Sequence, residues 1–98
     1  MRFRILPPAT LELREAVRFY EERVPGLGRE LLEEFRATTA RIIANPAAWM
    51  TLEASIRRCR MHRFPYGVIY SLEEGQILIV SVMHLHRHPQ IWKRNLRN

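Results

Sequence analysis

The period of the hydrophobic pattern changes once along the chain, and this change limits the folds that the chain can adopt. Between residues 10 and 44, apolar side chains recur every three or four positions in two stretches, which are separated by the helix-breaking corner Pro25-Gly26-Leu27-Gly28. From Ile56 onward the period is two, as in strands whose side chains alternate between two faces. We therefore expect two helices that form an antiparallel hairpin, followed by a group of strands.

The first half of the chain supplies the helical hairpin. A short strand is expected over residues 3–6, followed by a first helix with Thr10 as its N-cap and a second helix that ends at Asn45-Pro46. Residues 47–55 are expected to form a loop. The apolar positions of the two helices should face a common core, and they are Leu13, Ala16, Val17, Tyr20, Val24, Leu31, Leu32, Phe35, Thr39, Ile42 and Ile43.

The second half supplies most of the sheet. Along the strand that begins at Ile56, Cys59 and Met61 fall on one face. The opposite, basic face consists of Arg58, Arg60 and His62. Because Pro65 cannot donate a hydrogen bond to a ladder, it should mark the end of this strand or a bulge.

Two further strands and a short helix complete the chain. Strands over residues 68–72 and 77–83 are joined by Glu74-Gly75, a pair suited to the positive φ angles of a tight hairpin. Residues 77–83 are apolar on both faces, which indicates a central strand, and Pro89 should open a final helix over residues 90–95. The predicted order is β-α-α-β-β-β-α in one domain over residues 1–98. This order predicts an α+β fold with the helical hairpin on one face of a mainly antiparallel sheet.

The net charge of the chain comes from its second half. In residues 1–56, eight arginines are balanced by eight glutamates. Residues 57–98 hold seven arginines and Lys93 against only Glu73 and Glu74, so the whole formal charge of +6 lies there. A field of one sign on one part of a protein favours association with an acidic partner.

The sequence also indicates where the protein works. A single cysteine, Cys59, cannot form an intrachain disulfide, which suits a reducing cytoplasm. A membrane-spanning helix needs about 20 apolar residues. The apolar run from Ile77 to Val80 is much shorter, so we expect a cytoplasmic protein that does not associate with a membrane.

The order of elements and several motifs resemble the RelE/ParE superfamily of bacterial toxins. The residues that carry the likeness are the Leu13–Tyr20 helix, the Pro25-Gly26-Leu27-Gly28 corner, Asn45-Pro46, Arg57-Arg58, Arg63-Phe64-Pro65-Tyr66 with Tyr70, and the ending His84, Arg87-His88-Pro89 and Trp92. The resemblance implies the toxin of a type II toxin–antitoxin system, a cognate antitoxin, and growth arrest when the toxin is free. Members of the superfamily act on DNA gyrase, as in the ParE branch, or cut mRNA at the ribosome, as in the RelE branch.

Two positions favour the ParE branch over the mRNA interferases. Gly67 stands where an RNase-type member tends to have an arginine, and Trp92 stands near the usual C-terminal tyrosine. Since tryptophan has no titratable group, it cannot carry a proton in catalysis. The resemblance therefore implies a ParE-like, plasmid-stabilisation type toxin that inhibits DNA gyrase. The alternative is an endoribonuclease that acts on mRNA at the ribosome, and a third possibility is a simple nucleic-acid-binding module.

A catalytic hypothesis accompanies the alternative function. Cleavage of RNA needs a proton acceptor, a proton donor and positive charge near the phosphate, which histidines and arginines supply. These groups would meet if the end of the last strand lay beside the strand that begins at Ile56. The candidates are His84, His86, Arg58, Arg60 and Arg87. The other interpretation is that the same residues form a solvated basic rim that holds an acidic antitoxin.

Other chemistries receive less support from the sequence. His84, His86 and His88 alternate and would share one face of a continued strand, but Pro89 should end the strand first. Ser81 and the lone cysteine have no evident base partner and no nucleophile motif around them. We therefore expect no metal and no cofactor.

A binding hypothesis accompanies the preferred function. The partner should be an acidic, partly disordered antitoxin that folds onto the toxin in a hetero-oligomer. The residues expected to contact the antitoxin or the target are Arg57, Arg58, Arg60, Arg63, Arg87, Trp92, Lys93, Arg94 and Arg97. Two roles stay open for Trp92: an exposed anchor among cations, or a side chain that packs the last helix on the sheet.

Overall fold

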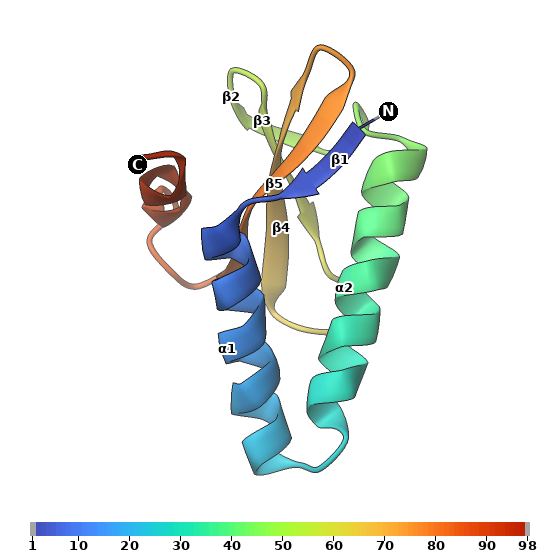
Figure 1. Ribbon diagram of the computed structural model, residues 1–98, viewed down its shortest axis with the longest axis vertical. Coiled ribbons are helices and arrows are strands. Elements are labelled where there is room, and N and C mark those ends of the chain that lie inside the picture. The colour runs from blue at the N-terminus through green and yellow to red at the C-terminus, as the bar shows by residue number, and fades with distance from the viewer. Residues whose placement is uncertain (1, 98) are drawn as a thin grey trace.

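The computed structural model describes residues 2–97, which form two long helices, a five-stranded sheet and a short C-terminal helix (Figure 1). The elements are β1 (Arg2–Ile5), α1 (Pro7–Arg23), α2 (Leu27–Ala44), β2 (Met50–Glu53), β3 (Ile56–Arg60), β4 (Tyr66–Glu73), β5 (Gln76–His84) and the 3₁₀ helix η1 (Ile91–Leu96). The predicted α+β fold is confirmed. One strand, β2, was not predicted, because residues 47–55 were expected to be a loop.

The first helix begins earlier than predicted. Pro7 and Pro8 occupy its first positions, where a missing N–H costs nothing and the fixed φ angle suits a helix. The residue before them, Leu6, is the N-cap, and no side chain caps this end. Thr10 lies inside the helix, so the expected N-cap role of Thr10 is wrong.

The corner between the helices is fastened by one carboxylate. Glu21 accepts hydrogen bonds from the backbone N–H groups of Gly26 and Gly28, at 2.9 and 3.0 Å. Gly26 has a φ angle of 91°, which glycine adopts without strain. A Cβ atom on Gly28 would lie 2.7 Å from the carbonyl oxygen of Val17, so glycine lets the two helices approach closely.

The strands follow the order β1-β5-β4-β3-β2. β5 pairs in parallel with β1 and antiparallel with β4, which confirms the predicted central position of residues 77–83. Between β4 and β5, Glu74 and Gly75 have φ angles of 49° and 71°, as the predicted tight hairpin requires.

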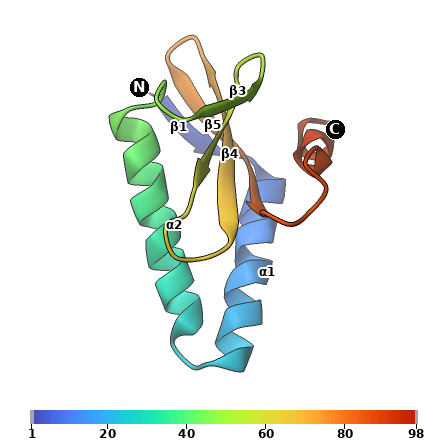
Figure 2. The same ribbon diagram turned by 180° about the vertical axis from the view of Figure 1, so that it is seen from behind.

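The sheet carries a core on each face. The larger core lies between the helical hairpin and the sheet, and of the side chains predicted there it buries Ala16, Leu31, Phe35, Ile42, Cys59 and Met61. Leu13, Val17 and Tyr20 are partly buried against it, whereas Val24 and Ile43 are exposed. The smaller core, on the opposite face, consists of Ile56, Ile69, Val80, Met83 and Trp92. In Figures 1 and 2, the C-terminal helix lies on the side of α1 that faces away from α2.

Within residues 2–97, neither long helix is apolar enough over its length to cross a membrane.

Candidate functional site

A basic hollow of about 470 Å³ lies where β3 ends and where the chain leaves β5. It is lined by Arg58, Arg60, Met61, His62, Arg63, Phe64, Pro65, Leu85 and His86. The alternation along β3 explains its charge. Because Cys59 and Met61 are buried in the helix-facing core, Arg58 and Arg60 project from the opposite face of the sheet. We call these lining residues the basic hollow.

Gly67 makes room for one of these arginines. A Cβ atom at position 67 would lie 2.9 Å from Cδ and 3.0 Å from Cγ of Arg58. The Arg58 side chain therefore lies across the strand over a position that has no side chain. Its Nη2 group lies 3.4 Å from the sulfur of Met50, and its buried Nε has no hydrogen-bond partner among the described residues. In the sequence, Gly67 was singled out only because RNase-type members tend to have an arginine there, so its role in making room for Arg58 was not predicted.

Contacts with α2 hold the loop that forms the rim of the basic hollow. The guanidinium of Arg63 pairs with the carboxylate of Glu30 and lies 5.2 Å from the ring of Phe64. The backbone N–H of His62 donates to Glu34 at 2.7 Å. Arg60, His62 and Arg63 are all exposed, and of the two arginines only Arg63 is paired with a carboxylate of the described residues. His62 was placed on the basic face by the sequence but was not chosen as a site residue.

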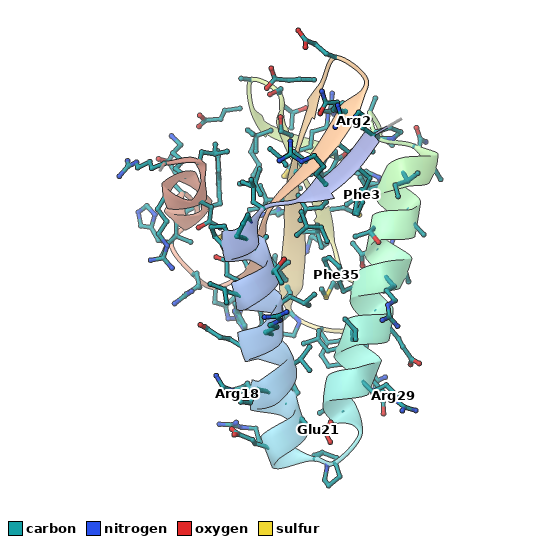
Figure 3. The ribbon with its side chains drawn as sticks, viewed as in Figure 1. Arg2, Phe3, Arg18, Glu21, Arg29 and Phe35 are labelled. Carbon is teal, nitrogen blue, oxygen red and sulfur yellow. The ribbon has the colours of Figure 1, made fainter. Side chains whose placement is uncertain are left out.

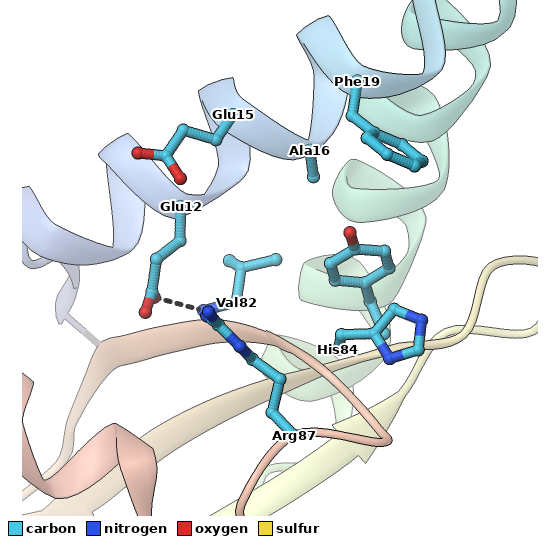
Figure 4. Close-up of a pocket in the computed structure, with 8 residues that line it drawn as sticks. Glu12, Glu15, Ala16, Phe19, Val82, His84 and Arg87 are labelled. Carbon is cyan, nitrogen blue, oxygen red and sulfur yellow. Dashed lines mark hydrogen bonds between the residues drawn. The ribbon is translucent and has the colours of Figure 1, made fainter. Parts of the chain in front are cut away.

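A second hollow, of about 280 Å³, lies on the other face of the sheet, beside α1 (Figure 4). It is lined by Glu12, Glu15, Ala16, Phe19, Tyr66, Val82, His84 and Arg87. The rings of Tyr66 and His84 are 5.1 Å apart between centroids, as expected for directly paired residues of β4 and β5. Burial is the main reason that the pKa of Tyr66 is raised, and nearby Arg87 opposes this shift. Tyr66 is therefore a neutral hydroxyl at physiological pH.

One carboxylate ties this second hollow to the C-terminal segment. The same oxygen of Glu12 accepts hydrogen bonds from the Ser81 hydroxyl at 2.9 Å, the Val82 N–H at 3.0 Å and the Asn95 amide at 3.1 Å. Asn95 also donates to the carbonyl oxygen of Val80 at 2.9 Å. Ser81, the one polar residue among residues 77–83, therefore has a structural partner. No pattern in the sequence indicated the role of Asn95.

The five residues of the catalytic hypothesis do not share one hollow. β4 lies between β3 and β5, so the end of β5 is not beside the strand that carries Arg58 and Arg60. His84 and Arg87 line the hollow beside α1, whereas His86 lines the basic hollow with the two β3 arginines. The two imidazole rings are still close, at 5.1 Å between centroids. The predicted set is thus divided between the two faces of the sheet.

The histidines at the end of β5 do not continue its alternation. The strand ends at His84, and the Nδ1 atom of this residue accepts a hydrogen bond from the His86 N–H at 3.1 Å. His88 similarly accepts from the Gln90 N–H at 3.2 Å. Within residues 2–97, no three His, Cys, Asp or Glu side chains are grouped so that they could hold a metal ion.

Two members of the predicted binding set have structural tasks. Arg57 lies on the helix-facing side and donates to the carbonyl oxygens of Ala47 and Trp49, at 3.0 and 2.8 Å. Trp92 is only 2% exposed, and its indole N–H donates to the Pro89 carbonyl at 2.9 Å. The exposed-anchor role for Trp92 is therefore wrong, and its packing role is confirmed.

The remaining cations of the C-terminal segment differ in their surroundings. Lys93 pairs with Glu53 of β2 at 3.1 Å. Arg94 and Arg97 are exposed and form no salt bridge with a carboxylate of the described residues. The positive charge that this segment presents to a partner therefore comes mainly from the two arginines.

Comparison with known proteins identifies the family. Residues 3–89 match the family model of the ParE toxin of the type II toxin–antitoxin system parDE. The chain belongs to the ParE toxin family. A solved chain of the chromosomal ParDE TA system from P. aeruginosa has a similar fold, with a TM-score of 0.76 at 14% sequence identity. The match covers 88% of this ParE-family chain and 97% of that chain. No match was found among curated protein sequences.

Proposed function

We propose that this ParE-family toxin arrests growth by binding and inhibiting DNA gyrase, and that a cognate acidic antitoxin neutralises it. The observation that carries the proposal is the family match over residues 3–89, because gyrase inhibition is the activity expected of this family. The arrangement of the side chains supports it. Arg58 and Arg60 project from the sheet face opposite the helical hairpin, while His84 and Arg87 lie beside α1.

This division weakens a mechanism based on the predicted catalytic set. General acid–base catalysis requires the proton donor and acceptor within hydrogen-bond reach of one bound substrate, beside groups that stabilise the developing negative charge. His84 lines the hollow beside α1, whereas the two β3 arginines project from the opposite face of the sheet, so these three side chains are not arranged around one common site. A toxin that works by binding requires only that its basic residues be exposed and correctly placed.

The antitoxin proposal rests on charge and on the structural neighbour, which belongs to a ParDE toxin–antitoxin system. An acidic segment that folds onto the basic hollow would pair with Arg58, Arg60 and their neighbours. Burial of apolar surface such as Leu85 and Pro65 would add to this attraction. The antitoxin would then cover the surface that the target needs, which explains neutralisation without any further mechanism.

Growth arrest after induction of variants tests the proposal. His84→Gln with His86→Gln should keep most of the toxicity, because glutamine keeps polarity and approximate size but loses the titratable proton. Arg58→Glu with Arg60→Glu should abolish it. The matched control is Arg29→Glu with Arg36→Glu, two exposed positions of α2 outside the hollow. Soluble, folded protein must be confirmed for each variant. Loss of toxicity in the histidine pair alone would contradict a binding mechanism.

An mRNA interferase is the second candidate, and one observation favours it. His62 and His86 line the same hollow as Arg58 and Arg60, so imidazole and guanidinium groups are present together. If this hollow cleaves RNA, His86→Gln should reduce ribosome-dependent mRNA cleavage on the order of 10²-fold or more, the scale of general acid–base catalysis. His88→Gln, outside the hollow, is the matched control.

A further inference from the structure

The outer side of β1 is an open edge of the sheet. β1 is the first strand in the order, and its pairing with β5 is regular, with Arg2–Ile5 matched to Gln76–Ile79. The opposite edge strand, β2, has an irregular register between Thr51 and Glu53. A bulge of this kind hinders the addition of another strand, and the pairing of β1 with β5 contains none.

The backbone of β1 presents unpaired groups along this edge. The N–H of Leu6 donates to the carbonyl oxygen of Ile79 at 2.9 Å. Because backbone groups alternate in direction along a strand, the N–H and C=O groups of Phe3 and Ile5 point away from β5. No described group outside the ladder forms a hydrogen bond with them. Two donors and two acceptors, two residues apart, have the spacing that an added strand uses.

The side chains of β1 indicate which strand could pair there (Figure 3). Phe3 and Ile5 pair with Ile77 and Ile79 and so share the helix-facing side of the sheet, where they remain 37% and 38% exposed. Arg2 and Arg4 lie on the other face, are exposed, and form no salt bridge within residues 2–97.

We propose that the β1 edge binds an extended segment of a partner protein in which acidic and apolar residues alternate. The acidic residues would lie opposite Arg2 and Arg4, and the apolar residues would extend the large core beside Phe3 and Ile5. Main-chain hydrogen bonds to β1 would supply the affinity, and the alternation of acidic and apolar side chains would supply the specificity.

A second copy of the toxin does not fit this edge. Antiparallel pairing of two β1 strands that keeps Phe3 and Ile5 on a common face also places arginine opposite arginine, which is destabilising. The inference goes beyond the proposed function, because β5 and β4 separate β1 from the strand that carries Arg58.

The test uses the full chain and a synthetic seven-residue peptide in which Glu and Val alternate, with both ends blocked. We expect the peptide to bind in isothermal titration, and the backbone amide NMR signals of Phe3 and Ile5 to shift most. The same peptide with Lys in place of Glu should not bind. Methylation of alternate peptide nitrogens should abolish binding, because it removes the donors that a ladder needs.

Phe3→Pro separates strand addition from simple charge attraction. Proline removes the outward N–H of residue 3 without removing a bond to β5, a position that edge strands tolerate. We expect the dissociation constant to rise at least about tenfold, whereas the control Phe3→Val, which keeps the N–H, changes it less than about threefold. Equal affinity of the wild type and Phe3→Pro would place the peptide elsewhere and overturn the inference.

A charge exchange keeps the inference testable if Phe3→Pro fails to fold. Arg2→Glu with Arg4→Glu should lose the Glu-Val peptide and gain the Lys-Val peptide. Failure of the wild-type chain to bind the Glu-Val peptide would refute the proposal. So would sedimentation that shows a toxin dimer disrupted by Phe3→Pro, because the occupant of the edge would then be a second copy.

Discussion

Phe35 is the largest side chain that α2 buries, and only 5% of its surface is exposed. Its replacement by alanine should reduce the free energy of unfolding by roughly 3–5 kcal/mol, the usual cost of deleting a large buried aromatic side chain. Urea denaturation measures this. The control is Phe19→Ala, since Phe19 is 44% exposed and should cost less than about 1.5 kcal/mol. Equal losses for the two variants would mean that the larger core is misplaced.

Tyr70 gives the protein a specific sensitivity to alkaline pH. Its hydroxyl donates to the carbonyl oxygen of Pro46 and lies in the larger core. Burial raises the pKa of Tyr70 to about 12, although Arg57 opposes the shift. In the unfolded chain the pKa is about 10. Between these values the unfolded chain has lost the proton that the folded chain keeps, so stability falls as the pH rises above about 10.

Tyr70→Phe should remove this dependence. At pH 8 the variant should be about 1 kcal/mol less stable, because one hydrogen bond is lost. From pH 9 to pH 11, the stability of the wild type should approach that of the variant, since only the wild type loses the contribution of Tyr70. Urea midpoints across this range measure the difference. Parallel curves for the two proteins would show that Tyr70 does not cause the alkaline loss.

The role of a single residue could be predicted when it depends on neighbours in the sequence, and not when it depends on contacts between separate elements. Cys59 and Met61 were correctly placed in the core because strand alternation alone decides their face. The sequence did not decide between the two roles of Trp92, because its burial depends on side chains of β3, β4 and β5 that come together only in the folded sheet. Arg57 was assigned to binding because an arginine that holds a distant loop has the same sequence pattern as one that faces solvent.

At the scale of elements, the C-terminal helix η1 combines a buried side with a charged side. Trp92 and Asn95 attach it to the sheet and to Glu12 of α1, while Arg94 and Arg97 face outward. Truncation before Trp92 would remove the packing contacts and the exposed positive charge together. Substitution of the two arginines tests the proposed binding role of this segment separately from its packing.

Arg94→Glu with Arg97→Glu should abolish growth arrest with little effect on the melting temperature, because neither side chain packs in a core. Trp92→Ala should instead lower the free energy of unfolding by roughly 3–5 kcal/mol. Thermal melts and growth curves together check both expectations. Full toxicity in the double arginine variant would remove this segment from the target-binding surface.

The elements that the sequence predicted well are those whose signals lie within a few residues. The tight turn at Glu74-Gly75 and both helices were predicted from turn chemistry and from the hydrophobic period. β2 was missed, because four residues with mixed character have no distinctive pattern and pair only once β3 is in place. The start of α1 was misplaced because a threonine cap was preferred to Pro7-Pro8.

At the scale of the whole molecule, the separation of charge along the chain becomes a separation in space. Six of the eight first-half arginines lie on α1 and α2 together with seven of the eight glutamates. In the second half, Arg58, Arg60 and Arg63 line the basic hollow, and Arg94 and Arg97 lie in or next to η1. The sequence predicted a basic surface in the second half of the chain, but not that this surface is divided between the basic hollow and the C-terminal segment. The separation of His84 from Arg58 and Arg60 depends on the strand order, in which β4 lies between β3 and β5, and no local pattern contains this order.

The charge of the second half should control association with the antitoxin. The association rate should fall as salt rises from 50 to 500 mM, because the Debye length shortens from about 14 to about 4 Å and exposed charges are then screened. Arg58→Glu with Arg60→Glu should weaken the complex, and the control pair on α2 should not. Stopped-flow mixing and titration measure both. Affinity that is insensitive to salt and to charge reversal would point instead to an apolar interface on the helices.

The most direct test of the central claim is a DNA supercoiling assay with purified gyrase and purified toxin, run beside an assay of mRNA cleavage on ribosomes. The account predicts loss of supercoiling with intact mRNA, equal inhibition by the variant with His84→Gln and His86→Gln, and none by the variant with Arg58→Glu and Arg60→Glu. Unaffected supercoiling together with mRNA cuts that disappear with His86→Gln would contradict the account and establish an mRNA interferase.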